Sequence, residues 1–267
     1  DEWRASPLGE SKRGEAVARR IRRTAKRTAR NIISQYADSS FKPMQMEFVF
    51  GQNGISPILL ELADGTFVYL QGRIDRIDMT ADGAVRIIDY KSGGKKFDPT
   101  LVYWGLQLQL LLYMAAAIAR IPESRAAGFF YCRVADPTVK TEIRMKEEVE
   151  KQIAKKLALS GITLSDVSIL RAQGGAQAGM VTKDGKPNGR YASSMVTDEG
   201  MEHLIAFARN KATTLAGDIY AGIIDDSPYE RGSLNACQSC DYAPICTFDP
   251  ERKPRRRLSA KTLDDLL

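Results

Sequence analysis

The alternation of apolar and polar residues in the first third of the chain predicts a set of short strands. Four runs rich in β-branched and aromatic residues are separated by turn sequences: 44–50, 57–62, 67–78 and 84–91. Runs of this length with Gly and Asp between them are typical of antiparallel strands. The last two are joined by a turn that ends in Asp82-Gly83, which predicts a β-hairpin with Gly83 at the left-handed position.

Helical periodicity dominates the rest of the chain. Four segments carry apolar residues at the spacing of a helix: 14–36, 98–119, 145–159 and 198–216. The second has Asp98 as an N-cap and Pro99 at the first helical position, and its leucines cover nearly all faces, so one buried helix is predicted. A further core strand is expected at 127–135. Strands and helices in this order are typical of a mixed α/β domain.

The hairpin 72–91 places two carboxylates and a lysine on one face. If its loop has three residues, Asp75 lies directly opposite Asp89. Alternation along the second strand then puts Lys91 on the face of Asp89 and turns Tyr90 to the other face. A slip of one residue would separate the two aspartates, so this arrangement depends on the turn.

Two adjacent carboxylates repel each other unless a cation or a proton lies between them, and oxygen ligands of this kind suit Mg²⁺ or Mn²⁺. A lysine beside such a metal holds an attacking water or offsets charge on a phosphate. The alternative is a surface hairpin in which Asp and Lys pair across the strands. The isoleucines that flank the charged residues favour the metal site, because unpaired charges on partly buried strands are costly.

Three further polar residues lie among apolar neighbours. Gln109 and Tyr113 are one turn apart on the second predicted helix, where they form either a polar pair within the core or a pair directed at a substrate. Glu47 either reaches the metal site as an outer acid or pairs with an arginine such as Arg73 or Arg76. The pairing role is slightly favoured.

Charge gives the chain a modest preference for polyanionic partners. Lys and Arg number 39 against 33 Asp and Glu, a net charge of +6 with a pI of about 9.1. Residues 12–30 hold nine of the basic residues, as either a solvated helix face or a DNA contact. Residues 92–96 form a basic loop suited to a phosphate backbone, and 252–257 a mobile arm or contact segment.

Several classes of protein are excluded by what the sequence contains. The one histidine, His203, rules out a mechanism that needs two histidines of this chain, and without a GxxxxGK[ST] loop the chain is not a P-loop ATPase. Because no run approaches 18 apolar residues and no signal-peptide pattern begins the chain, we expect a soluble, cytoplasmic protein without a membrane partner.

Three of the four cysteines lie within ten residues near the end: Cys237, Cys240 and Cys246. In an intracellular protein this spacing favours zinc or a [4Fe–4S] cluster over disulfides, and both metals normally take four ligands. The fourth ligand is Cys132, another group of the chain, or a residue outside it. The alternatives are three free thiols and, for Cys132, a small buried hydrophobic residue.

Four motifs in one order resemble the RecB-type nucleases of the PD-(D/E)XK superfamily. They are GRIDRID, IIDYKSG, QLLLY and the cysteine pattern, and the similarity extends over 41–249. Within that superfamily the sequence is similar to the nuclease domains of the B subunits of bacterial AddAB helicase–nucleases. The resemblance implies an α/β nuclease core, a mixed central sheet flanked by helices, with a cysteine-ligated extension. The expected domains are 1–40, a basic helical lead-in, 41–235, the nuclease domain, and 236–267, the iron–sulfur segment and basic tail.

The same resemblance implies a role for each motif residue. Asp75 and Asp89 would bind the divalent metal, with the Tyr90 carbonyl as a further ligand, and Lys91 would position or activate water. The motif would be completed by two residues of the next helix, Gln109 and Tyr113. The chain would be a metal-dependent exonuclease that hydrolyses DNA phosphodiesters, on the strand ending 5′, at double-strand ends processed for recombinational repair. Its partners would be DNA and an AddA-type helicase–nuclease subunit in a heterodimer.

Two departures from the family pattern set limits on this expectation. The family's first cluster cysteine lies upstream of the nuclease strands, where this chain has none, and an upstream histidine ligand is also missing. We therefore expect a chain that begins late, with the fourth cluster ligand outside it. Two alternatives stay open: a non-catalytic, cluster-stabilised module that binds DNA ends as a scaffold, and a stand-alone CRISPR-adaptation-type nuclease, which should carry all four cysteines.

Overall fold

A central sheet of six strands organises the fold. The computed structural model describes residues 11–52, 55–140, 146–177 and 179–267. The strands are, in spatial order, β1 Lys42–Phe50, β4 Gly72–Met79, β5 Ala84–Lys91, β6 Arg125–Arg133, β7 Ser160–Leu164 and β8 Met195–Val196. β5 and β6 are parallel, as are β7 and β8, and the other neighbours are antiparallel. This mixed sheet confirms the predicted fold class.

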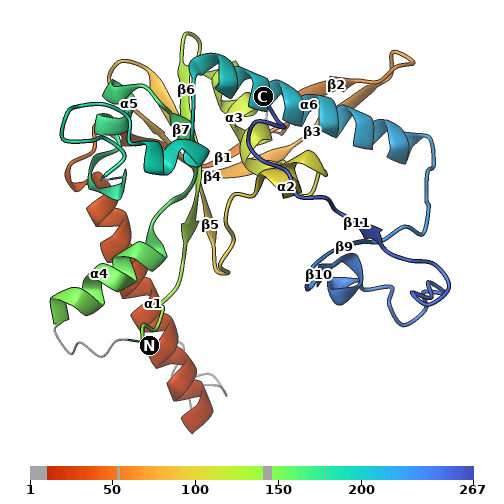
Figure 1. The fold of residues 1–267 in the computed structure, drawn as a ribbon, viewed down its shortest axis with the longest axis horizontal. Coiled ribbons are helices and arrows are strands. Elements are labelled where there is room, and N and C mark those ends of the chain that lie inside the picture. The colour runs from red at the N-terminus through yellow and green to blue at the C-terminus, as the bar shows by residue number, and fades with distance from the viewer. Residues whose placement is uncertain (1–10, 53–54, 141–145, 178) are drawn as a thin grey trace.

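Helices cover both faces of the sheet (Figure 1). They are α1 Lys12–Ala37, α2 Pro99–Tyr103, α3 Gln109–Arg120, α4 Lys146–Leu157, α5 Val167–Ala172 and α6 Asp198–Tyr220. α3 and α6 share the main apolar core with one face of the sheet. α1 lies against the opposite face and projects beyond the sheet next to α4 (Figure 1). The first ten residues of the predicted lead-in segment and Met145 lie outside the described residues.

Short elements complete the architecture. A two-stranded ribbon pairs β2 Ile58–Glu61 with β3 Phe67–Leu70. A small sheet of β10 Leu234–Asn235, β9 Tyr229–Arg231 and β11 Arg256–Arg257 forms a lobe beyond the end of α6 (Figure 1). Three 3₁₀ turns lie at η2 Gly174–Gln177, η3 Gly189–Ser194 and η4 Ala236–Ser239. Within the described part of the chain, every helix is too short or too polar to cross a bilayer.

The prediction of one continuous helix over 98–119 is wrong. The segment forms α2 and α3, which are separated at Gly105, where φ is +80°. The positive φ favours glycine here, and a Cβ would also lie 2.8 Å from Leu215 Cδ1 of α6, so that this side chain would have to move. Gln107 is buried and holds the break by accepting from the Asp98 N–H and donating to the Lys96 carbonyl. Leucine periodicity does not reveal such a break, because both pieces are apolar.

The C-terminal residues return to the main core. The segment expected as a mobile arm or contact, 252–257, ends in β11. After it the chain buries Leu258, Leu263 and Leu266, and the last two join the main apolar core. The Trp104 indole donates to the carbonyl of Ser259. The basic segment 252–257 is therefore held at its C-terminal end by strand pairing and packing.

Candidate active site

The β4–β5 hairpin has the predicted register. The Thr80 N–H donates to the Ala84 carbonyl at 2.9 Å, around a loop that ends in Gly83 with φ +83°. Arg76 lies opposite Ile88, and one step further along the same register places Asp75 opposite Asp89. The two carboxylates therefore share one face of the sheet, the face covered by α3.

Asp89 is a buried carboxylate without a full set of partners. Its residue is 2% exposed. Lys91 Nζ lies 2.6 Å from Asp89 Oδ2 as an ion pair, but this oxygen accepts no hydrogen bond of good geometry from the described residues. Burial raises the pKa of Asp89 and the charge of Asp75 adds to this rise, while the two nearby lysines oppose it. A further cation beside such a carboxylate would lower the free-energy cost of keeping its charge buried.

Asp75 is oriented by the backbone of the opposite strand. Its Oδ2 accepts from the Tyr90 N–H at 2.7 Å, which leaves its other oxygen and part of this one for a ligand. The Tyr90 side chain lies on the other face, where its hydroxyl accepts from Arg76 at 2.8 Å. Tyr90 thus brings only its backbone to the carboxylate face, as the alternation predicted. Its carbonyl as a metal ligand stays a prediction.

Tyr131 of β6 and the basic loop complete the floor of the site. Lys91 Nζ and Lys95 Nζ lie 5.9 and 5.1 Å from the centre of the Tyr131 ring. Burial and the neighbouring Lys91 lower the pKa of Lys95. The Tyr131 hydroxyl is buried without a hydrogen-bond partner among the described residues, and burial together with Asp89 raises its pKa. The predicted phosphate-binding loop therefore folds back over the carboxylate face.

Sequence reasoning did not identify Tyr131 as a site residue. It interpreted 127–135 only as a core strand, and alternation within that strand places Tyr131 on the same face as Phe129. What brings Tyr131 to the site is the parallel pairing of β5 with β6, in which it lies beside Asp89. The sequence alone does not specify which strand becomes the neighbour of β5.

Gln109 and Tyr113 begin α3 next to this face. Gln109 Nε2 donates to the Tyr113 hydroxyl at 3.0 Å. The Tyr113 ring packs edge-on against Phe50, with the ring centres 6.0 Å apart, and lies over Gly72. Any Cβ at Gly72 would approach Phe50 to 2.8 Å. The pair is internally bonded and close to the catalytic strand, which leaves both the structural and the substrate-directed role possible.

Glu47 has the pairing role rather than a ligand role. Its carboxylate lies 3.1 Å from Arg73 Nε, with both side chains more than half exposed. The residue has φ +52°, an uncommon conformation for a side chain of this type. Its ion pair lies in solvent, so a contribution of less than about 1 kcal/mol to stability is expected.

The donor set of the hairpin fits a hard divalent cation. Two carboxylates face one another across adjacent strands, and the buried Asp89 has only Lys91, 2.6 Å from its Oδ2, as an ion-pair partner among the described residues. No group of three or more His, Cys, Asp or Glu within those ranges is arranged around a metal. The remaining ligands would be backbone carbonyl, water and substrate oxygens, which is the usual pattern for Mg²⁺.

The cysteines do not form a ligand set as folded here. Cys237, Cys240 and Cys246 are free thiols on the partly or fully exposed C-terminal lobe, and the described residues contain no three-residue metal cluster. Cys132 is fully buried on β6, where Gln35 donates to its sulfur at 3.5 Å and burial raises the pKa of its thiol. Cys132 is thus the small buried residue that its context predicted, and no chemical step is derived through a cluster.

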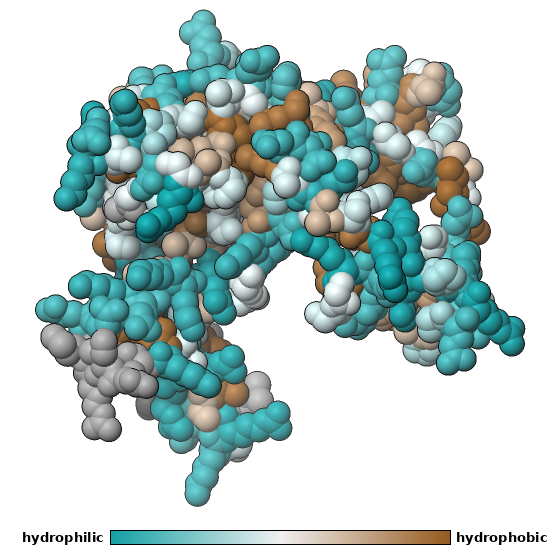
Figure 2. Space-filling view, in the orientation of Figure 1, coloured by the Kyte–Doolittle hydropathy of each residue, from teal (hydrophilic) through white to brown (hydrophobic). Residues whose placement is uncertain are grey.

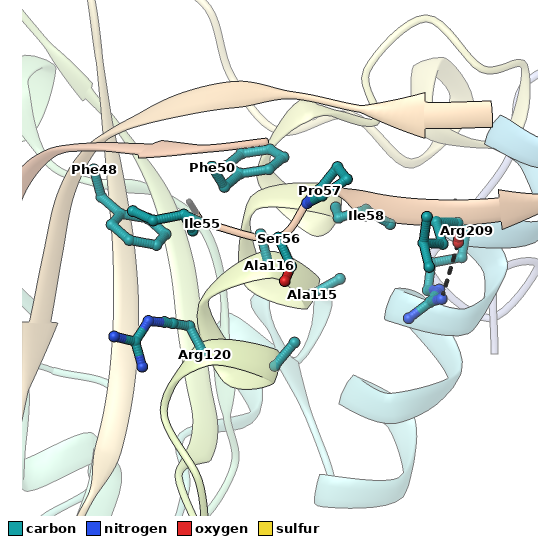
Figure 3. Close-up of a pocket in the computed structure, with 12 residues that line it drawn as sticks. Phe48, Phe50, Ile55, Ser56, Pro57, Ile58, Ala115, Ala116, Arg120 and Arg209 are labelled. Atoms are coloured by element: carbon teal, nitrogen blue, oxygen red, sulfur yellow. Dashed lines mark hydrogen bonds between the residues drawn. The ribbon is translucent and has the colours of Figure 1, made fainter. Parts of the chain in front are cut away.

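A second cavity lies away from these residues. It has a volume of about 520 Å³ and opens between the β1–β2 connection, α3 and α6 (Figure 3). Phenylalanine, isoleucine and alanine side chains line it, and Arg120 and Arg209 stand on either side. Arg209 donates to the Leu59 carbonyl at 3.5 Å. None of the candidate site residues lines this cavity, so it is not the candidate active site.

The central hairpin of the mixed sheet carries two carboxylates and a lysine, and the adjacent helix α3 carries a bonded Gln–Tyr pair. This combination defines a nuclease of the PD-(D/E)XK class. The family model described as PD-(D/E)XK nuclease superfamily matches residues 1–247. The chain therefore belongs to that superfamily.

The relatives of this chain are larger proteins. The chain is 36% identical over 255 residues to the B subunit of the ATP-dependent helicase/deoxyribonuclease of Alkaliphilus metalliredigens, covering 89% of this chain and 22% of the relative. It is 34% identical over 270 residues to the protein of the same name from Acetivibrio thermocellus, covering 95% of this chain and 23% of the relative. The chain thus spans less than a quarter of the length of these relatives.

Proposed function

We propose that this chain is the metal-dependent DNA nuclease domain of a bacterial helicase–nuclease B subunit, which processes double-strand DNA ends for recombinational repair. The observation that carries the proposal is the buried Asp89 opposite Asp75, with Lys91 Nζ at 2.6 Å from its carboxylate. A binding scaffold needs no buried, incompletely paired carboxylate, and keeping one is unfavourable. The names of the relatives support the assignment to a helicase and deoxyribonuclease.

The residues of the hairpin divide the chemistry between them. Asp75 and Asp89 would hold Mg²⁺ or Mn²⁺, which when bound supplies positive charge to the scissile phosphate and acidifies water. Lys91, fixed by its ion pair, would orient the attacking water. Lys95, held over Tyr131, would place its charge against a nonbridging phosphate oxygen. Gln109 and Tyr113 would contact the substrate from the start of α3.

The expected polarity of the cleaved strand and the expected partner subunit rest on the family resemblance and not on the geometry of the site. We infer cleavage of the strand ending 5′ and a heterodimer with an AddA-type helicase–nuclease subunit. The relatives are named as subunits, which supports a partner chain. The arrangement of the hairpin favours neither strand polarity, since its carboxylates and lysines would act on the phosphate alone.

Removal of divalent metal tests the proposed activity. We expect EDTA to abolish cleavage of a linear duplex in the presence of the partner subunit and ATP, and added Mg²⁺ or Mn²⁺ to restore it, because two carboxylates cannot hold a phosphate without a cation. Separate 5′ and 3′ end labels report which strand is shortened. Cleavage that persists at full rate in EDTA would refute the metal site, and loss of only the 3′-ended strand would refute the polarity.

We also propose that the three C-terminal cysteines bind a [4Fe–4S] cluster with a fourth ligand from outside this chain. Their free thiols and short spacing support this, although the ligands would have to converge on binding. We expect iron and sulfide in the anaerobically purified full-length protein, lost in Cys240→Ser and kept in the control Cys132→Ser. Iron analysis and visible absorbance measure this. A parent protein without iron, or equal iron in both variants, would contradict the cluster.

A further inference from the structure

A basic pocket lies at the carboxyl ends of β5 and β6, on the side of α1 and α4. Its volume is about 560 Å³, and its polar wall is formed by α1, the chain that follows β6, and one turn of α4. Four cationic side chains line it against one carboxylate: Arg20, Arg23, Arg133 and Lys156 against Asp136. The lining residues thus carry a surplus of positive charge.

The surplus is not neutralised by neighbouring acids. The Asp136 carboxylate is shared, 3.3 Å from Arg23 Nε and 3.5 Å from Arg27 Nε. Arg20 forms no ion pair within the described ranges. The Nε atom of Arg133 is buried and has no hydrogen-bond partner among the described residues. A buried guanidinium nitrogen without an acceptor is costly, so an anion bound beside Arg133 would stabilise it.

The pocket is next to the candidate active site along the chain, at the carboxyl ends of β5 and β6. Ser92 lines it and directly follows Lys91. Lys91 lies opposite Arg133 in the parallel β5–β6 pairing, and the Val134 N–H donates to the Lys91 carbonyl at 2.9 Å. An anion bound in the pocket would therefore contact residues that directly follow Lys91, the lysine paired with Asp89.

The surroundings of the pocket suit a long polyanion. Figure 2 shows a hollow below the central sheet, between the projecting α1–α4 column and the lobe of β9–β11, and hydrophilic residues dominate its visible walls. A series of guanidinium groups matches repeated phosphates, since each planar fork donates to two oxygens of one phosphate.

We propose that this basic pocket holds phosphates of the DNA strand adjacent to the scissile phosphate. The inference rests on the proposed nuclease function and adds to it a second phosphate-binding position. Arg133 would contact the phosphate next to the reacting one, and Arg20 and Arg23 those that follow. Base identity would not matter, because backbone contacts carry no sequence information.

Salt-dependent binding of single-stranded DNA tests the pocket without cleavage. Fluorescent oligothymidylate is titrated with the protein in EDTA between about 50 and 200 mM salt, where each phosphate contact on a single strand contributes about 0.7 to the slope of log K against log salt. For Arg20→Gln with Arg23→Gln we expect this slope to fall by about 1.4 and the affinity by about tenfold at the lower salt. Arg133→Gln should lower the slope by about 0.7, with its melting temperature measured to confirm folding.

The matched control removes the same charge from the same helix. Arg22→Gln with Lys26→Gln changes two exposed residues that do not line the pocket, and its slope should stay within about 0.3 of the parent. A pocket variant that binds like this control would overturn the proposal, as would oligoglutamate of equal length competing as well as oligothymidylate. Because the assay contains no metal and measures no cleavage, its outcome is independent of the metal-removal test of the proposed nuclease activity.

Discussion

Asp89→Asn is expected to lower the rate of DNA cleavage on the order of 10³-fold at saturating Mg²⁺. The amide is isosteric but neutral, so it removes a buried metal ligand and at the same time the ion-pair partner that holds Lys91 at 2.6 Å. Initial rates on end-labelled DNA, measured over a range of Mg²⁺ concentrations, give the loss. Excess metal should not restore the rate, because the position of Lys91 is also lost.

The control for this variant lies on the same hairpin. Asp82→Asn makes the same change in the exposed turn, far along the strands from the carboxylate pair, and should keep the parental rate. Unfolding does not account for the expected loss in Asp89→Asn. Because burial raises the pKa of Asp89, the ionised carboxylate opposes folding above that pKa, and a neutral amide relieves this. If Asp89→Asn cleaves DNA within a few-fold of Asp82→Asn, Asp89 is not a metal ligand.

The hairpin could be predicted from its local sequence, whereas the pairing of strands far apart in the sequence could not. The glycine of the turn set the register, and the register placed Asp75 opposite Asp89, since a period of two leaves no choice of face. The break at Gly105 could not be predicted, because the leucines on its two sides have the spacing expected both for one long helix and for two short ones. Tyr131 and Arg133 reach the site only through the pairing of β5 with β6, a contact between segments about 40 residues apart that leaves no periodic trace.

The largest omission of the sequence reasoning lies on the other face of the hairpin. Arg76, Asp78 and Arg86 are all fully buried there. Asp78 accepts from both arginines, at 3.1 and 2.9 Å, and Tyr36 of α1 donates to its second oxygen at 3.1 Å. A strand that reads Arg-Ile-Asp is typical of a solvent-exposed face. It becomes interior only because α1 covers it, whereas the basic residues 12–30 predict for that helix either a solvated face or a DNA contact.

Asp78→Asn is expected to destabilise the fold by about 3 to 5 kcal/mol, because it leaves two buried guanidinium groups without a counter-charge. Burial already lowers the pKa of Arg86, which shows the direction of that cost. Urea unfolding followed by circular dichroism measures the free energy of unfolding. Glu47→Gln is the control, since it breaks an ion pair that is more than half exposed and should change stability by less than about 1 kcal/mol. A loss below about 1 kcal/mol in Asp78→Asn would mean that water or rearranged partners satisfy the arginines.

The two aspartate variants should separate stability from chemistry within one hairpin. Asp78 and Asp89 lie on opposite faces of adjacent strands, and the contacts of Asp78 run to α1 rather than to the carboxylate pair. Asp78→Asn should therefore lose cleavage activity only in proportion to its unfolded fraction, and low temperature should recover it. Asp89→Asn should stay folded and inactive at every temperature. An Asp78 variant that is folded yet inactive would show that α1 positions the active site through this network, beyond stabilising it.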